Sequence, residues 1–351
     1  DPRDADVLYV PRRTRGIVKS MDRGKSWVPI NEGILNTVIP LLALGNGAGS
    51  TMYVAAQGGE GTFRSFDWGE SWENVTDGGI SHPFTDELAV SPVQQATVWE
   101  VADVGQFFVS HDHGSNWEMT VDPRGPGRGF RAGIVQAVAA APSDPSRVYA
   151  VKSGYGIFRS LNGGHGWDFL HQSEVDYTYG LAVHPTNPDV VFSGYNPKPF
   201  QDWAMVRRST DGGESWDTVL EVPHSGGITS VEIDPQNPNV IYAASIGSSA
   251  GGGGQIYRSD DGGDTWEPLN SHFTMLTVWG QPQLIGDPGD PSTAYVSTWL
   301  GGTWKTTDAG QTWMLLDQAP QSCTALSLDP AQPEVIYAAD RTESTVWKSA
   351  D

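Results

Sequence analysis

The stretch Ser259-Asp260-Asp261-Gly262-Gly263-Asp264-Thr265-Trp266 decides the fold of this chain because the same pattern recurs along the whole sequence. The pattern is Ser-x-Asp-x-Gly-x-Ser/Thr-Trp, and we refer to each copy as a box. The boxes close at Trp27, Trp72, Trp117, Trp167, Trp216, Trp266 and Trp313. Consecutive tryptophans lie 45 to 50 residues apart. Periods of this length are typical of proteins that repeat one supersecondary unit.

Two of the boxes depart from the pattern. The copy at 110–117 has Asn116 in the seventh place, and the copy at 160–167 has Asn162 for aspartate and Gly166 for the second hydroxyl residue. An eighth copy begins at Ser349-Ala350-Asp351. The departures leave the spacing intact, so the array of repeats extends over the whole chain.

The residue types of the box indicate a folding device. Glycine permits a tight turn that a Cβ would forbid, and a neighbouring carboxylate or hydroxyl can accept hydrogen bonds from backbone N–H groups. The tryptophan is expected to pack between neighbouring sheets and to bury a large apolar area. We therefore assign a structural and not a catalytic role to the box carboxylates, which are Asp22, Asp67, Asp112, Asp211, Asp261 and Asp308.

The segments between the boxes read as strands. Within one repeat, an alternating strand ends at Asp234-Pro235, a turn follows at Asn237-Pro238, and a β-branched and aromatic strand spans 240–244. A third strand, 256–259, leads into the box, and the tryptophan opens a fourth. Four short strands per repeat predict an all-β chain with the blades of a β-propeller.

Counting these strands favours eight blades. Residues 1–30 hold strands two to four of a repeat, six full repeats follow, and residues 323–351 hold strands one to three of another. This makes 3 + 24 + 3 = 30 strands, between the 28 of seven four-stranded blades and the 32 of eight. We expect one domain, 1–351, with incomplete terminal blades. Two alternatives are seven blades with a surplus first hairpin, and an excerpt of a larger protein.

Composition excludes several classes of function. The net charge of −21 repels phosphate backbones, so we expect no nucleic-acid partner. The chain holds no run of 18 apolar residues, so we expect no membrane insertion. Cys323 is the single cysteine, which excludes an intrachain disulfide and a C-x-x-C site and is read as a buried thiol.

No cofactor or metal is expected either. The run Gly251–Gly254 lacks the Lys-Ser/Thr of a phosphate-binding loop. His111 and His113 lie inside one box and are read as surface histidines and not as metal ligands.

The boxes resemble the Asp-box, or BNR, repeats of sialidases, sortilin-type receptors, xyloglucan-cleaving glycosidases and photosystem II assembly-factor propellers. The resemblance covers essentially the whole chain and implies a β-propeller, but these families share the fold without sharing a task. It also implies an extracellular or periplasmic location. The Arg-Ile-Pro segment of sialidases is missing, and Pro11-Arg12-Arg13 is a poor substitute for it. The acidity of the chain does not favour the role of the photosystem assembly factors.

Ligand-binding residues are expected on the side of the propeller opposite the boxes. That side carries the loops between strands two and three and the connections between blades, which have no part in the repeat's own structure. Aromatic and basic side chains there suit either a sugar ring or a protein partner, although some of them could simply pack under the loops. The candidates are His82, Phe130, Arg131, Tyr177, Tyr179, Trp203, Trp279 and Trp299.

Catalysis has one weak candidate. Glycoside hydrolysis uses two carboxylates about 5–10 Å apart, and ten carboxylates on the loop side give no distinct pair. The segment Ala102-Asp103-Val104-Gly105 resembles the Asp-Ile-Gly-Gly segment that carries a catalytic aspartate in xyloglucan-cleaving glycosidases, so Asp103 is the catalytic candidate. Those enzymes place the second carboxylate on a second propeller, and this chain has one. We therefore favour an extracytoplasmic, non-catalytic module that binds a protein or glycan; the alternative is a xyloglucanase-like glycoside hydrolase.

Overall fold

A computed structural model describes most of the chain. The described residues are 7–12, 16–22, 26–34, 41–44, 51–56, 61–76, 85–91, 94, 96–102, 106–120, 135–152, 156–172, 177–196, 203–223, 225–234, 237–247, 255–269, 283–287, 290–298, 302–308, 311–316, 323–328, 336–340 and 345–349. They divide into two compact units, one of residues Asp1–Lys152 and Ile157–Leu170, the other of Ser153–Gly156 and His171–Asp351.

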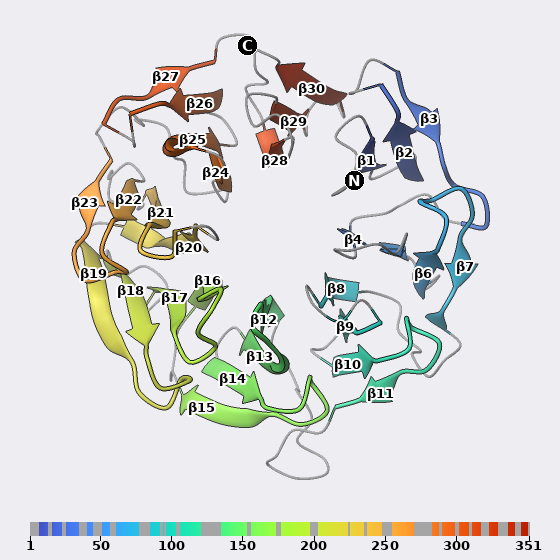
Figure 1. Ribbon diagram of the computed structural model, residues 1–351, viewed down its shortest axis with the longest axis horizontal. Coiled ribbons are helices and arrows are strands. Elements are labelled where there is room, and N and C mark those ends of the chain that lie inside the picture. Colours follow the sequence, from blue (N-terminus) through green and yellow to red (C-terminus); the bar gives the residue numbers. More distant parts are fainter. Residues whose placement is uncertain are drawn as a thin grey trace. The chain divides into compact units, whose positions relative to one another are not determined.

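The first unit holds four antiparallel sheets, of which the last extends into the second unit at Gly156, His171 and Gln172 (Figure 1). Each sheet is a meander in which consecutive strands pair. The strands are β1 (Leu8–Arg12), β2 (Gly16–Ser20) and β3 (Val28–Pro29); β4 (Leu41–Leu44), β5 (Met52–Ala56), β6 (Gly61–Ser65) and β7 (Glu73–Asn74); β8 (Thr85–Val90), β9 (Val98–Ala102), β10 (Gln106–Ser110) and β11 (Glu118–Met119); β12 (Val135–Ala141), β13 (Asp144–Lys152), β14 (Gly156–Ser160) and β15 (Asp168–Gln172).

The second unit repeats the same plan in four further meanders. The strands are β16 (Tyr177–Val183), β17 (Val191–Asn196), β18 (Trp203–Ser209) and β19 (Asp217–Pro223); β20 (Ser225–Ile233), β21 (Ile241–Gly247), β22 (Ile256–Ser259) and β23 (Glu267–Pro268); β24 (Gln283–Asp287), β25 (Asp290–Thr298), β26 (Gly302–Thr306) and β27 (Met314–Leu315); β28 (Cys323–Leu328), β29 (Ile336–Asp340) and β30 (Thr345–Ser349).

The structure confirms the strand pattern read from the repeats. The described residues form thirty strands in eight sheets, and the first and last sheets have three strands each. The first sheet lacks the strand that opens a repeat, and the last lacks the strand that follows a box. Eight sheets are consistent with the eight blades favoured by the strand count.

The core of each unit lies between successive sheets because both faces of the second strands are buried. In β5, Met52 and Val54 pack with Ile17 of the first sheet, whereas Tyr53 and Ala55 pack with Phe108 of the third. Alternate side chains of a strand point to opposite faces, so one strand contributes to two cores. This explains why these strands are apolar throughout and do not alternate between apolar and polar residues.

The box hydrogen bonds agree with the folding role inferred from the sequence. In the box at 209–216, Asp211 Oδ1 accepts from the Ser209 hydroxyl at 2.8 Å and from Ser215 N at 2.9 Å, and Asp211 Oδ2 accepts from the Ser215 hydroxyl at 2.6 Å. The Ser209 hydroxyl oxygen accepts from Gly213 N at 2.7 Å. Gly212 N donates to Asp189 O at 2.9 Å, which places the box beside the turn between strands one and two.

The box tryptophans are held in two different ways. Trp72 Nε1 donates to Ile30 O of the preceding sheet at 2.8 Å, and Trp117 Nε1 donates to Val75 O at 3.1 Å. Trp216 and Trp266 instead donate to the box glycine carbonyls, Gly213 O at 2.9 Å and Gly263 O at 3.1 Å. The buried Trp72 and Trp117 side chains therefore bond neighbouring sheets to each other as well as filling the core between them.

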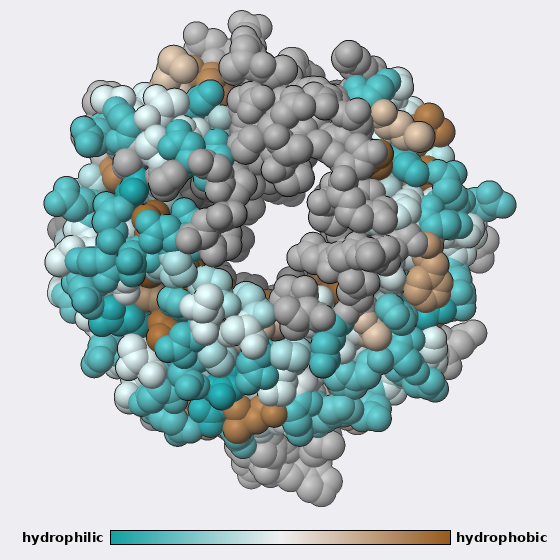
Figure 2. All heavy atoms as spheres, viewed as in Figure 1, coloured by the Kyte–Doolittle hydropathy of each residue, from teal (hydrophilic) through white to brown (hydrophobic). Residues whose placement is uncertain are grey.

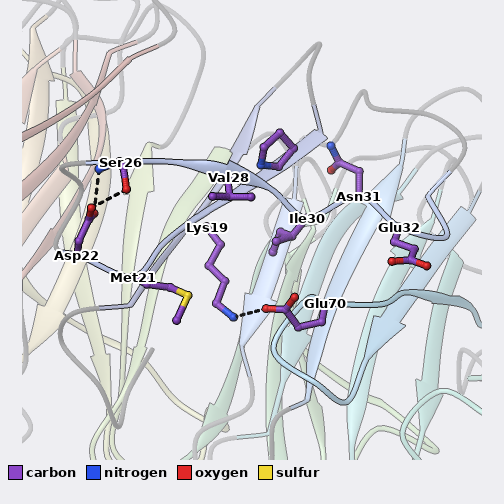
Figure 3. A pocket seen from close by; sticks show the side chains of 10 residues that line it. Lys19, Met21, Asp22, Ser26, Val28, Ile30, Asn31, Glu32 and Glu70 are labelled. Atoms are coloured by element: carbon purple, nitrogen blue, oxygen red, sulfur yellow. Dashed lines mark hydrogen bonds and ion pairs between the residues drawn. The ribbon is translucent and has the colours of Figure 1, made fainter.

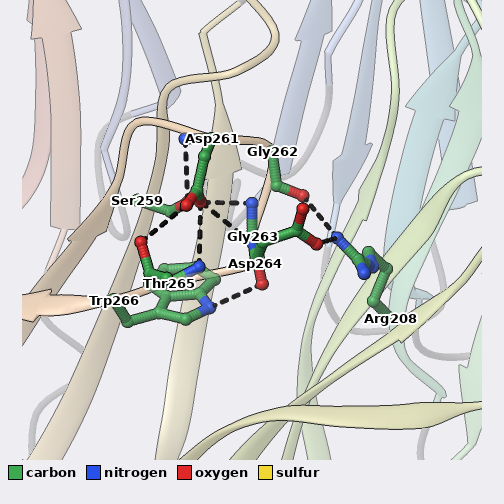
Figure 4. A network of polar contacts seen from close by, with 8 residues as sticks. All are labelled: Arg208, Ser259, Asp261, Gly262, Gly263, Asp264, Thr265 and Trp266. Carbon is green, nitrogen blue, oxygen red and sulfur yellow. Dashed lines mark hydrogen bonds and ion pairs between the residues drawn. The ribbon is translucent and has the colours of Figure 1, made fainter.

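A basic residue stands immediately before most boxes, and Lys19, Arg64 and Arg208 link neighbouring repeats. Arg208 Nη1 donates to Gly262 O at 2.9 Å and to Asp264 Oδ1 at 2.6 Å, both in the box of the next sheet (Figure 4). Lys19 Nζ donates to Glu70 in the next box at 2.8 Å. The basic residues in this place are Lys19, Arg64, Arg159, Arg208, Arg258 and Lys305.

Charged and polar residues dominate the surface of the described part. On the face in view, apolar side chains are scattered among hydrophilic ones (Figure 2). Among the described residues, no helix is long and apolar enough to cross a membrane.

Candidate binding site

Two of the predicted binding residues come to the same end of the sheet β16–β19. Tyr177 begins β16 and is the register partner of Asn196, the last residue of β17. Trp203 begins β18 and is the register partner of Pro223, the last residue of β19. This is the end that carries the connection between strands two and three, opposite the box.

Trp203 is the predicted binding residue whose side chain the structure describes in full. It is 49% exposed, whereas Trp72, Trp99, Trp117 and Trp167 are buried in the cores between sheets. On the same face of β18, two residues further along each time, lie Met205 and Arg207. The Arg207 guanidinium lies 4.1 Å from the centre of the buried Tyr195 ring on β17.

A cation stacked on a ring holds the guanidinium in place on β17 and β18. Strand alternation therefore produces a row of tryptophan, methionine and arginine along one face of β18, and Trp203 stands at the loop-bearing end of that row. Such side chains bind partners without a covalent reaction, because they offer apolar area and donors but no acid, base or nucleophile.

The tyrosines are placed differently from the expectation in one respect. Tyr177 and Tyr179 lie on β16 and not in the connection between blades. The pairing of Tyr177 with Asn196 and of Thr178 with Tyr195 extends the ladder into that connection, and a register shift lies between Thr178 and Leu181. The remaining candidates fall outside the described residues; they are His82, Asp103, Phe130, Arg131, Trp279 and Trp299.

The carboxyls that the structure describes fall into separate environments. Hydrogen bonds, first from the Ser215 hydroxyl, lower the pKa of Asp211 to about 2, and bonds from Thr265 do the same for Asp261. These box carboxylates stay ionised and engaged at neutral pH. Glu232 on β20 is exposed, and the Ser230 hydroxyl donates to its carboxylate at 3.5 Å.

Sequence reasoning overlooked two carboxyls on strands. Glu232 alternates with the core residues Val231 and Ile233 in a strand that otherwise reads as structural. Glu100 on β9 is buried and accepts from the Thr62 hydroxyl at 2.7 Å. An acidic residue inside an apolar strand is the signal that could have drawn attention to both.

Asp103 lies between two strands that the structure describes. Ala102 ends β9, Gln106 begins β10, and these two residues are register partners, so 103–105 form the connection between them. This connection is of the strand-two-to-three type, at the loop-bearing end of its sheet.

The histidines of the third box lie near the surface but contact neighbouring boxes. His111 stacks on His165 with ring centres 4.4 Å apart, and His113 meets Phe66 edge-on at 5.5 Å. Burial, and then the neighbouring His165, hold the pKa of His111 below its ordinary value. Within the described ranges, no three histidine, cysteine or acidic side chains are placed to hold a metal ion.

Comparison with known proteins shows the fold. Residues 204–351 match the Sortilin-Vps10 family, described as sortilin, neurotensin receptor 3. A GH74 xyloglucanase from Xanthomonas campestris is similar over 100% of this chain, with a TM-score of 0.63 and 15% identity. The match covers 65% of that enzyme, so the chain spans just under two-thirds of its length. The chain is a β-propeller of the Asp-box type.

Other solved propellers are also similar. YCF48 bound to D1 peptide matches over 84% of this chain and 87% of its own, with a TM-score of 0.55 and 16% identity. The computationally designed Ika8 protein matches over 98% of this chain and 92% of its own, with a TM-score of 0.66 and 13% identity. No curated protein sequence matches this chain significantly. At such identities the Asp-box propeller resembles both hydrolases and binding proteins in fold alone.

Proposed function

We propose that this Asp-box propeller is a non-catalytic, extracytoplasmic binding module that recognises another protein through the loop-bearing ends of its sheets. The observation that carries the proposal is the exposed Trp203 at the loop-bearing end of β18, with Arg207, which stacks on Tyr195, further along the same face. Tryptophan, tyrosine and arginine dominate the energetics of protein interfaces. The similarity in fold to YCF48, which was solved with a bound peptide, supports a polypeptide ligand.

A selection experiment tests this function. Peptides selected from a random phage library on the wild-type chain should bind the Trp203→Ala variant at least tenfold more weakly, the loss typical of a tryptophan at an interface. Met314→Ala, which removes another exposed apolar side chain, is the matched control and should bind as the wild type does. Binding that appears only on a glycan array, or peptides that ignore Trp203, would refute a protein ligand at this end.

A glycoside hydrolase is the second candidate, and the resemblance of Ala102-Asp103-Val104-Gly105 to the Asp-Ile-Gly-Gly segment of xyloglucan-cleaving glycosidases is the observation in its favour. In the sequence this segment follows β9 and precedes β10. Reducing-sugar release from a panel of plant and microbial polysaccharides, abolished in Asp103→Ala and retained in Asp67→Asn, would establish this function. Absence of release by the wild-type chain would leave the binding function as proposed.

A further inference from the structure

A pocket of about 400 Å³ opens in the first unit, between the first and second boxes (Figure 3). It lies over β2 and β3 of the first sheet and reaches the second box at Glu70. Its lining residues are Lys19, Met21, Asp22, Ser26, Val28, Pro29, Ile30, Asn31, Glu32 and Glu70. The loop-bearing end proposed above contributes no residue to it, so the following inference is independent of that function.

Between later boxes of this unit, the side chain at the corresponding place contacts the next box. Met21, Phe66 and His111 each hold the second position of a box. Phe66 meets His113 of the next box edge-on, and His111 stacks on His165 of the box after it. Met21 is instead 70% exposed. At the pocket, a flexible thioether therefore stands where each of the next two repeats has a ring that contacts the next box.

The first and second repeats also differ in the basic residue that precedes the box. Arg64 reaches across to the third box, donating to His113 O at 2.6 Å and to the Ser115 hydroxyl at 2.9 Å, and its guanidinium lies 4.3 Å from the Phe66 ring. Lys19 makes a single bond across, to Glu70 Oε1 at 2.8 Å. One ammonium leaves space that a forked guanidinium occupies one repeat later.

The charges of the pocket are unbalanced. Its acidic residues are Asp22, Glu32 and Glu70, and its one basic residue is Lys19, so the net formal charge of the lining is −2. Asp22 is engaged by its own box, through Ser20 and Ser26. Among the described residues, the Glu32 carboxylate accepts no hydrogen bond, and Glu70 accepts one on Oε1.

The apolar residues of the lining indicate which kind of ligand the pocket fits. Met21 is 70% exposed and Val28 is 62% exposed, and both line the pocket. The acidic side chains belong to the same lining. Long cationic side chains bind in this way, with the methylene stem on an apolar surface and the charged group near carboxylates. Arginine is favoured over lysine, because its planar group can bond two carboxylates at once.

We propose that this pocket binds an arginine side chain of a polypeptide partner, with the stem against Met21 and Val28 and the guanidinium facing Glu32 and Glu70. It is a second recognition site, at the box end of the repeats. The partner is a polypeptide with an exposed arginine, attracted by a chain of net charge −21.

Methyl NMR locates the site. The chain, labelled with ¹³C-methyl methionine, is titrated with the peptide acetyl-Ala-Arg-Ala-amide; of the six methionine methyls, Met21 should shift most. Saturation-transfer NMR, which detects magnetisation passed from the protein to the arginine side-chain protons of the bound peptide, then compares the affinities of the variants for the peptide. Glu32→Gln and Glu70→Gln should each weaken binding about fivefold, the effect of one solvent-exposed ion pair. Glu267→Gln, an exposed carboxylate outside the pocket, should leave binding unchanged.

A filling variant tests the pocket itself without changing its charge. Met21→Phe places a ring at the position that Phe66 holds in the next box, and saturation transfer should disappear while the melting temperature is kept. The same peptide with citrulline in place of arginine should not bind. The proposal is overturned if Met21 fails to shift, if citrulline binds as well as arginine, or if Glu32→Gln and Met21→Phe bind as the wild type does. Agmatine, which has the guanidinium without a peptide, overturns the polypeptide assignment if it binds more tightly.

Discussion

Replacement of Arg208 by methionine should destabilise the second unit by about 1.5 kcal/mol, because it removes two hydrogen bonds between neighbouring repeats. Arg208 Nη1 donates to Asp264 Oδ1 at 2.6 Å and to Gly262 O at 2.9 Å (Figure 4). Methionine keeps most of the aliphatic stem of arginine and loses only the guanidinium. The variant therefore isolates the polar link between the two repeats from the packing beneath it.

The two bonds contribute differently. The Asp264 side chain is 65% exposed and that of Arg208 22%, so solvent screens the ion pair and about 0.5 kcal/mol is expected of it. The bond to Gly262 O joins a charged donor to a half-buried carbonyl, which is expected to add about 1 kcal/mol. Asp264→Asn removes only the first contribution and should cost about 0.5 kcal/mol.

Equilibrium unfolding in urea, followed by tryptophan fluorescence, measures both variants. At 1 M salt the Debye length falls to about 3 Å, so the loss in Asp264→Asn should almost vanish while most of the loss in Arg208→Met persists. If Arg208→Met cost no more than Asp264→Asn, or if salt abolished its effect entirely, the carbonyl bond would contribute nothing and the reasoning would be wrong.

Two further predictions concern the turn and the charge of the boxes. Gly263→Ala should destabilise the chain by about 2–3 kcal/mol, because φ is +91° and a Cβ would lie 2.7 Å from Phe192 Cε1. Gly262→Ala, at φ +75° and with an ordinary contact of 3.8 Å from the Cβ position to Asn239 Oδ1, should cost about 1 kcal/mol. Equal urea midpoints for the two variants would contradict this. The pKa of Asp211 and of Asp261 is lowered to about 2 from an ordinary 3.8, so their stabilisation is complete above about pH 4 and is lost as the pH falls towards 2. The unfolding midpoint of Asp261→Asn should therefore approach that of the wild type between pH 4 and pH 2, and a constant difference over that range would count against the assignment.

The strand pattern and the boxes could be predicted because they depend on local interactions. The Ser209, Asp211 and Ser215 hydrogen bonds join residues two or four positions apart, so the same residue spacing produces the same turn in every repeat. The box tryptophans were expected to pack between neighbouring sheets, and the clusters that hold Trp72 and Trp117 confirm it. The binding candidates could be predicted only as residue types on connections, and Trp203 is the one whose exposure the structure describes.

Sequence by itself determined that this chain repeats a four-stranded unit, and that each box carboxylate accepts hydrogen bonds within its own turn. Only the tertiary structure decided which side chains meet across the gaps between boxes: the rings of Phe66 and His111 contact the next box, whereas Met21 is 70% exposed at the pocket. The physical reason is that a box is stabilised within one hairpin, whereas a gap is closed by side chains from two sheets. Whether such side chains meet depends on how the sheets pack, which the spacing of a repeat does not specify.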